Sequence, residues 1–361
     1  MEPTAATLVP KIGKESFTQW QQHREIRQNI KSGKTWFNLP PPEKPPERHS
    51  PHQLNQCHRK VYYQQLNAPE ESRDPSGIFW TGTQFEEEWM MPYLEHIANE
   101  SGAYIRNSMW VDYTVDTDVG PIHIRGMTDP VIVDEDSRPI LLTEIKTKQS
   151  VKYATEPSDH HVAQAYAYLR GLSEEWEVDL RDAVLIYGDR TTLEIQVFHI
   201  EFDLDRWQDL VVAWATNHTV FRMNRELPPA DPEFGWECKF CSFKHRCGRA
   251  KDSKFSDVDA YGFLPLFNEY PEAKVIEYLD SHDGAKLTPT LASRYPDLID
   301  QYEVYEWACQ RCSAIYSFGV IEWDGNTESL PLCPGCANEA IPVPLAEPGP
   351  EAQRILDEDA Q

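Results

Sequence analysis

Eight cysteines in two spaced sets constrain this chain more than any other feature of its sequence. Spaced cysteines in a chain of 361 residues fit metal ligation better than a disulfide scaffold, which would be shorter and secreted. The first set joins one early cysteine to a late C-x2-C-x5-C triad, and its members are Cys57, Cys238, Cys241 and Cys247. A metal centre shared by these four thiolates would tie together both ends of one domain.

The second set is compact and reads C-x2-C, twenty residues, C-x2-C, formed by Cys309, Cys312, Cys333 and Cys336. This spacing predicts a structural Zn²⁺ site built from two knuckles, so we expect a small zinc ribbon over residues 303–345. With four sulfur ligands, such a site has no open position for catalysis. Acidic neighbours favour a protein partner over nucleic acid for this ribbon: Glu303, Glu306, Glu322 and Asp324.

The net charge of −25, from 59 acidic and 34 basic residues, would repel nucleic acid at long range. The charge is uneven, because residues 1–60 carry ten Lys and Arg against five Asp and Glu. An acidic, lysine-poor surface is also typical of a halophilic protein, since the screening length falls to about 3 Å in molar salt. The alternative is an acidic protein with an acidic partner. We expect no signal peptide and no membrane span, hence a cytoplasmic protein.

The pattern of apolar residues divides the chain into five parts. Residues 1–48 are expected to be an extension with a helix near 17–30 and a proline-rich linker, Leu39–Pro46. Residues 49–250 alternate helix and strand signals and are expected to form one α/β domain, with a helix beginning near Gly82 and another ending at Gly171. A helical linker over 251–302 precedes the ribbon, and 346–361 is expected to be a disordered acidic tail.

A predicted hairpin in the α/β domain concentrates charge among apolar residues. Side chains alternate along a strand, so Glu144 and Lys146 share one face of an otherwise apolar segment. Buried charges of this kind are costly unless the protein uses them. Asp129 lies at the end of the preceding strand, just before Pro130, and the hairpin is expected to bring it beside Glu144. A surface ion pair is the alternative for Glu144 and Lys146 alone.

These residue types suit a divalent cation acting on a phosphate. Mg²⁺ prefers oxygen ligands and keeps several waters, so Asp129 and Glu144 would suffice together with a substrate phosphate, and Mn²⁺ would serve in the same site. Lys146 would orient an activated water and stabilise developing negative charge. Glu86 is expected to add a third carboxylate. On the following helix, Gln164 and Tyr168 share one face, where they either contact the scissile strand or are core residues.

The segment from Ser50 to Arg249 resembles the PD-(D/E)XK nuclease superfamily, specifically its RecB-like branch with a four-cysteine iron–sulfur cluster, known from the Cas4 and AddB groups. The resemblance is carried by Cys57 in an entry helix, Gly82-Thr83-Gln84-Phe85-Glu86, Asp129-Pro130, Glu144-Ile145-Lys146, Gln164–Tyr168 and the C-x2-C-x5-C triad. Glu86 stands where members of the family often have histidine, and Glu87 competes with it for the role of ligand.

The resemblance implies a restriction-endonuclease-like α/β core, with a mixed sheet flanked by helices, and metal-dependent cleavage of DNA. It implies an exonuclease acting on single strands or DNA ends in repair, recombination or CRISPR adaptation. The alternative is a non-cleaving subunit of a DNA-processing complex that binds DNA or protein.

Spacing alone fits [4Fe–4S] and Zn²⁺ equally for the first cysteine set, and the resemblance favours iron–sulfur. Basic residues around this set are expected either to contact the DNA backbone or to compensate the cluster's charge: Arg59, Lys60, Lys244 and Arg246.

Overall fold

The computed structural model describes residues 4–31, 43–72, 76–251 and 258–354, and the chain divides into two compact units, Met1–Pro41 and Pro42–Gln361. The first unit holds helices α1 (Ala5–Leu8) and α2 (Lys14–Lys31), so the helix expected near 17–30 forms and is slightly longer. The proline-rich stretch begins in residues outside the described part. From Glu43 onward the chain belongs to the second unit.

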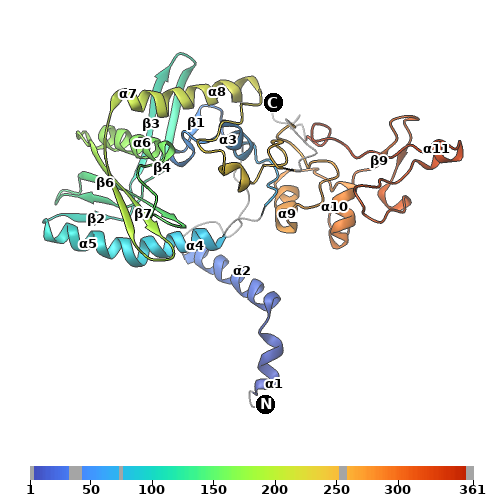
Figure 1. The fold of residues 1–361 in the computed structure, drawn as a ribbon, viewed down its shortest axis with the longest axis horizontal. Coiled ribbons are helices and arrows are strands. Elements are labelled where there is room, and N and C mark those ends of the chain that lie inside the picture. The colour runs from blue at the N-terminus through green and yellow to red at the C-terminus, as the bar shows by residue number, and fades with distance from the viewer. Residues whose placement is uncertain (1–3, 32–42, 73–75, 252–257, 355–361) are drawn as a thin grey trace. The chain divides into compact units, whose positions relative to one another are not determined.

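The second unit contains a five-stranded mixed sheet in the order β2-β5-β6-β7-β8, in which only β6 and β7 run parallel. Its strands are β2 (Tyr104–Arg106), β5 (Val131–Val133), β6 (Pro139–Lys148), β7 (Asp182–Asp189) and β8 (Ile195–Glu201). A second sheet, in the order β1-β4-β3, is formed by β1 (Arg48–His49), β4 (Gly120–Met127) and β3 (Trp110–Thr117). This arrangement confirms the expected α/β core with a mixed sheet flanked by helices (Figure 1).

Helices cover both faces of the larger sheet. One face shares a buried apolar core with helix α6 (Asp159–Trp176) and with a long helix made of α7 (Leu204–Trp207), a π-helical segment Gln208–Ala213 and α8 (Trp214–Asn224). The other face packs Ile145 and Ile186 against a helix made of α4 (Ser76–Phe85), a π-helical turn Glu86–Met90 and α5 (Met91–Glu100). Burying each large aliphatic side chain contributes about 1.5–3 kcal/mol, so both helical layers are held firmly.

Two glycines that were expected at helix termini lie inside helices instead. Gly82 lies within α4 beside Thr147 of β6, and the helix begins six residues earlier, at Ser76. Gly171 lies inside α6, where an added β-carbon would come within 2.8 Å of the Val111 β-carbon on β3. Close packing between the helix and the second sheet therefore explains Gly171, and α6 continues to Trp176, where Glu177 caps it in a left-handed conformation.

Residues 258–302, expected to be a helical linker, have a core of their own around helices α9 (Glu272–Ser281) and α10 (Pro289–Arg294). The ribbon that follows contains β9 (Trp307–Ala308), β10 (Ile315–Tyr316) and α11 (Pro334–Asn338).

The start of the expected disordered tail is ordered. Glu347 accepts hydrogen bonds from the backbone N–H groups of Leu266 and Thr290, at 2.6 and 2.5 Å. Gln353 is only 2% exposed and bonds both backbone groups of Phe263. Residues 346–354 therefore fasten the helical segment, and 355–361 lie outside the described residues.

Candidate active site and metal centres

Asp129 is fixed by contacts on both sides of it. Tyr168 donates a hydrogen bond to the carbonyl of Met127 at 2.7 Å, and Thr143 donates to the carbonyl of Pro130 through both its backbone N–H and its hydroxyl. One carboxylate oxygen of Asp129 accepts the backbone N–H of Ile145 at 2.8 Å. The structure therefore places Asp129 beside the strand segment that carries Glu144 and Lys146.

Glu144 is fully buried, with an exposure of 0%, and one of its carboxylate oxygens accepts a hydrogen bond from the ammonium of Lys146. Burial raises the pKa of Glu144, and the nearby Asp129 raises it further. Burial by itself would lower the pKa of Lys146, but Glu144 and Asp129 reverse this effect and raise it. Lys146 is thus a cation held against two carboxylates.

The second carboxylate oxygen of Glu144 is buried and has no hydrogen-bond partner among the described residues. An orphaned buried acceptor of this kind costs about 1–3 kcal/mol. A divalent cation shared with Asp129 would satisfy it, because both groups offer the oxygen ligands that Mg²⁺ and Mn²⁺ take. These residues therefore fit the expected metal.

Glu86 is a third carboxylate, and it comes from the helix on the other side of the sheet. It begins the π-helical turn Glu86–Met90, a local irregularity that often occurs at functional sites. Burial raises the pKa of Glu86 to about 7, with Asp129 raising and Lys146 lowering it. Glu87, the competing candidate, is exposed on the same turn. Glu86 is half-buried and close enough to Asp129 and Lys146 for their charges to shift its pKa, which favours Glu86 over Glu87 as the ligand.

Gln164 and Tyr168 are both buried on α6, where Tyr168 supports the strand end that leads to Asp129. Burial and the nearby Glu144 raise the pKa of the Tyr168 phenol, so it acts as a neutral donor. Gln164 reaches this phenol from one turn earlier. The tyrosine contacts the backbone of β4, as a positioning residue would.

Two pairs of polar residues near Lys146 were not predicted from the sequence as pairs. His161 on α6 bonds the hydroxyl of Tyr187 on β7 at 2.8 Å, and burial lowers its pKa well below the ordinary value, with Lys146 adding to the effect. His160 pairs with Glu233 at 3.1 Å. These pairs join residues that are 26 and 73 positions apart, so no local pattern could indicate them.

The first cysteine set is drawn from both ends of the domain. Cys57 and Cys247 each influence the pKa of Cys241, which burial raises to about 11, and Cys238 lies near Cys247. Arg59 donates to the sulfur of Cys247 at 3.9 Å and to the carbonyl of Pro228. This arginine therefore faces the thiols.

Arg246, expected to contact DNA, is wrongly assigned. Its side chain is fully buried and donates to the backbone carbonyls of Asp259, Tyr261 and Gly262. It joins the cysteine segment to the helical part of the chain and is out of reach of a phosphate backbone. Of the other basic candidates, Lys60 donates to Gln56 at 3.0 Å, and Lys244 is half-buried.

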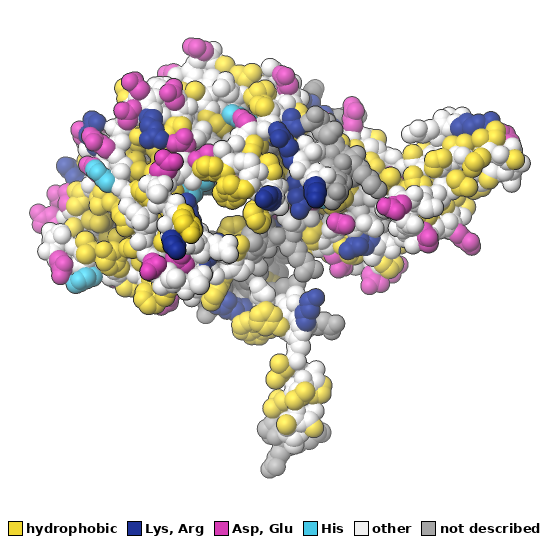
Figure 2. All heavy atoms as spheres, viewed as in Figure 1, with side chains coloured by type: hydrophobic (Ala, Val, Ile, Leu, Met, Phe, Trp, Pro, Cys, Tyr) yellow, Lys and Arg dark blue, Asp and Glu magenta, His cyan; other side chains and the backbone are white. Residues whose placement is uncertain are grey.

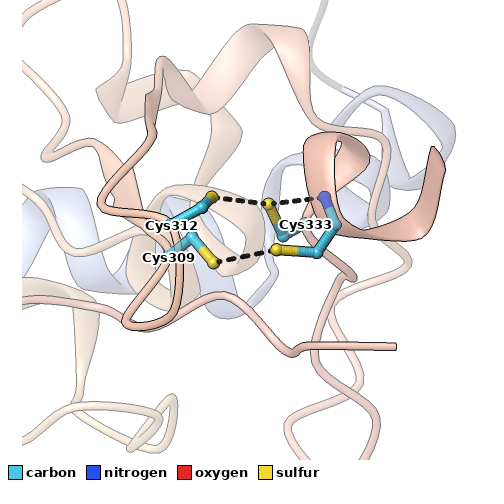
Figure 3. Close-up of side chains that lie close together, drawn as sticks. Cys309, Cys312 and Cys333 are labelled. Carbon is cyan, nitrogen blue, oxygen red and sulfur yellow. Dashed lines mark hydrogen bonds between the residues drawn. The ribbon is translucent and has the colours of Figure 1, made fainter. Parts of the chain in front are cut away.

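The second cysteine set forms a compact cage (Figure 3). The Cys309–Cys336 and Cys312–Cys333 sulfur pairs are each 3.7 Å apart. Four sulfurs at about 2.3 Å from a tetrahedral Zn²⁺ would lie about 3.8 Å from one another, so the cage has the right size for that ion. Among the described residues, this is the only group of three or more Cys, His, Asp or Glu ligand atoms that all lie within 4.8 Å of one another.

A family model of the PD-(D/E)XK nuclease superfamily matches residues 31–248, which is more than half of the chain. This chain belongs to that superfamily. The nuclease segment also matches the CRISPR-associated exonuclease Cas4 of Saccharolobus solfataricus, with 29% identity over 124 residues, or 34% of this chain. The match spans 52% of that relative, about half of its length.

Two solved structures also share limited similarity with this chain. The crystal structure of SSO0001 covers 63% of this chain and 93% of its own, with 18% identity and a TM-score of 0.36. The structure of Scheffersomyces stipitis Rai1 covers 36% of this chain and 34% of its own, with 14% identity and a TM-score of 0.16. Within the described part of the chain, no helix is both long and apolar enough to span a membrane.

Proposed function

We propose that this protein is a Mg²⁺- or Mn²⁺-dependent DNase that cleaves single-stranded DNA or DNA ends, most simply as an exonuclease. The observation that carries this proposal is the group of Asp129, Glu144 and Lys146, in which Glu144 is fully buried and has an unsatisfied oxygen. Asp129, Glu144 and Glu86 would hold the divalent cation. The cation, when bound, would acidify a water and offset charge on the phosphate.

The residues of the chain supply the remaining parts of the reaction. Lys146, held by Glu144, would donate to the attacking water or to the phosphate oxygen that gains charge. Tyr168 would keep Asp129 in place by bonding the carbonyl of Met127, and Gln164 would support Tyr168. A rigid placement of this kind is what phosphodiester cleavage requires, because the reacting groups must be aligned closely.

The test is cleavage of an end-labelled single-stranded oligonucleotide with Mn²⁺. Wild-type protein should cleave, and Lys146→Ala and Asp129→Ala should lose at least 99% of the rate. Lys152→Ala is the matched control, because Lys152 is an exposed lysine six residues beyond Lys146. Labels at the 5′ and 3′ ends identify polarity. Cleavage that persists in both active-site variants would refute the proposal. Tight DNA binding without turnover under any divalent metal would favour the non-cleaving subunit instead.

We further propose a [4Fe–4S] cluster on the first cysteine set and Zn²⁺ on the second. Among the described residues, no three sulfurs of the first set lie within 4.8 Å of one another. This wider separation in space supports the assignment, since each ligand of an iron–sulfur cube binds a different iron, whereas a single zinc ion binds all four sulfurs. Anaerobically purified protein should contain four irons and one zinc, with visible absorption from the cluster. Cys241→Ala should remove the iron and Cys336→Ala only the zinc. Two zincs without iron would contradict the cluster assignment.

The role proposed for the ribbon is to hold a protein partner. Its acidic residues support this, and so do three exposed apolar side chains, Ile315, Val320 and Leu332. If instead Cys336→Ala weakened DNA binding without affecting the nuclease core, a nucleic-acid role would replace it.

A further inference from the structure

Three exposed aromatic side chains lie at the start of the cysteine triad, two just before Cys238 and one between Cys238 and Cys241. Phe234, Trp236 and Phe240 are 41%, 57% and 78% exposed. The rings of Phe234 and Trp236 are stacked, with centroids 6.0 Å apart and planes 15° from parallel. Exposing several large aromatic faces together is costly in water, so we expect a ligand to cover these rings.

This aromatic segment, residues 234–240, is held rigidly beside the active site. Glu233 accepts the backbone N–H of Asp159 at 3.0 Å and pairs with His160, so the start of the segment is tied to the first turn of α6. Glu237 accepts the backbone N–H of Phe234 at 3.1 Å, which closes the segment into a turn. At its other end, Cys238 and Cys241 enter the first cysteine set.

Lysines connect the aromatic segment with the reaction centre. Lys60 lies on helix α3 (His58–Gln65), three residues beyond Cys57 of the first cysteine set, and donates to Gln56 at 3.0 Å. On the side of the reaction centre, His161, next to His160 on α6, bonds Tyr187, which is the register partner of Lys146 on the neighbouring strand. Lys239 is exposed between Trp236 and Phe240. One view of the molecule shows a hollow near its middle with Lys and Arg side chains gathered beside it (Figure 2).

Exposed aromatic rings with an exposed lysine among them favour single-stranded nucleic acid over an apolar protein partner. The segment reads Phe-Gly-Trp-Glu-Cys-Lys-Phe, so charged residues interrupt any continuous apolar surface. Unpaired bases stack on exposed aromatic faces regardless of sequence, while lysines contact the phosphates between them. A duplex keeps its bases stacked inside and offers no such faces.

We propose that Phe234, Trp236 and Phe240 form a base-stacking platform that guides a single DNA strand along Lys60 to the reaction centre at Lys146. The proposal deepens the proposed nuclease function and rests on it for the direction of the strand. The platform makes the protein selective for unpaired bases, and the cysteine set keeps the platform in place.

The test measures binding of fluorescent oligo-dT without added divalent metal, so that no cleavage is needed. Replacing both stacked rings, Phe234→Ala with Trp236→Ala, should weaken binding at least tenfold. Trp236→Phe, which keeps a ring, should bind within threefold of wild type. Tyr104→Ala is the matched control, because Tyr104 is 58% exposed on the edge strand β2. Thermal unfolding confirms that each variant is folded.

An abasic oligonucleotide of the same length separates stacking from phosphate contact. It should bind wild type and the double variant equally weakly, since both would then depend on the lysines alone. Equal binding of oligo-dT by wild type and the double variant would overturn the platform, even if the protein cleaves DNA. Ring-dependent binding without any cleavage under Mn²⁺ would support the platform while refuting the nuclease proposal.

Discussion

The ring of Phe85 lies directly against the bare Cα of Gly188, where an added β-carbon would overlap the aromatic carbons. Phe85 is the last residue of α4, and Glu86 follows it at the start of the π-helical turn. The glycine on β7 therefore allows the helix to approach the sheet and sets the position of Glu86 relative to Asp129.

Gly188→Ala should displace Phe85 and, with it, Glu86. Overpacking of this kind costs about 1–3 kcal/mol of unfolding free energy. We expect the rate of DNA cleavage to fall at least tenfold while the protein stays folded. Gly77→Ala is the control on the same helix, because no heavy atom lies within 4 Å of the added carbon. Normal cleavage by Gly188→Ala would show that Glu86 is not positioned through this contact.

Asp129 combines two roles that substitutions can separate. Its carboxylate accepts the backbone N–H of Ile145, and Asp129→Ala leaves this half-buried donor unpaired, at a cost of about 1–3 kcal/mol. Asp129→Asn keeps an oxygen acceptor but removes the charge. Both variants should lose cleavage, and only the alanine variant should lose substantial stability in urea unfolding. Equal stability of the two variants would rule out the structural role.

Two buried histidines should make the protein sensitive to mild acid. His49 and His218 are 1% and 0% exposed, and burial, followed by nearby charged groups, lowers their pKa values to about 3 and about 2. Unfolded histidine titrates near 6.5. Below that pH the unfolded chain binds more protons than the folded chain, so the free energy of unfolding falls as the pH decreases. The slope is about 1.4 kcal/mol per pH unit for each histidine.

Urea unfolding between pH 7.5 and 5 measures this slope. His218→Gln should reduce the slope by the contribution of one histidine, because glutamine does not titrate. The variant should still fold, since its neutral amide can bond Gln65, the partner of His218 at 3.1 Å. His96→Gln, at a side chain that is 66% exposed, should leave the slope unchanged. If His218→Gln also had no effect, the buried ring would not be a source of acid sensitivity.

Arg246 should matter for folding and not for DNA affinity. Arg246→Ala removes the donor shared by three backbone carbonyls of residues 259–262 and is expected to cost about 3–5 kcal/mol. Limited proteolysis should then cut residues 258–302 faster. Lys244→Ala, two residues away and half-buried, should leave proteolysis unchanged. Weaker DNA binding by a fully folded Arg246→Ala protein would contradict this view.

Much of the site followed from local sequence patterns. The alternation of a strand placed Leu142 in the core shared with α6 and Ile145 in the opposite core, so Glu144 and Lys146 had to share the first of these faces. The C-x2-C spacing likewise predicted the cage around Cys309 and Cys333, whose geometry depends on short stretches of chain. Strand alternation and C-x2-C spacing can be interpreted without knowledge of the fold, because they depend only on residues that are close in the sequence.

Contacts between distant segments were decided by the tertiary structure alone. Gly171 and Gly188 look like helix or loop residues in the sequence, yet both serve close packing against another element. Arg246 sits in a basic cluster but is buried by residues 259–262, and Glu233 meets His160 across 73 positions. A local sequence pattern does not indicate which distant segments come into contact, because the burial and pairing of residues are set by the packing of the whole domain.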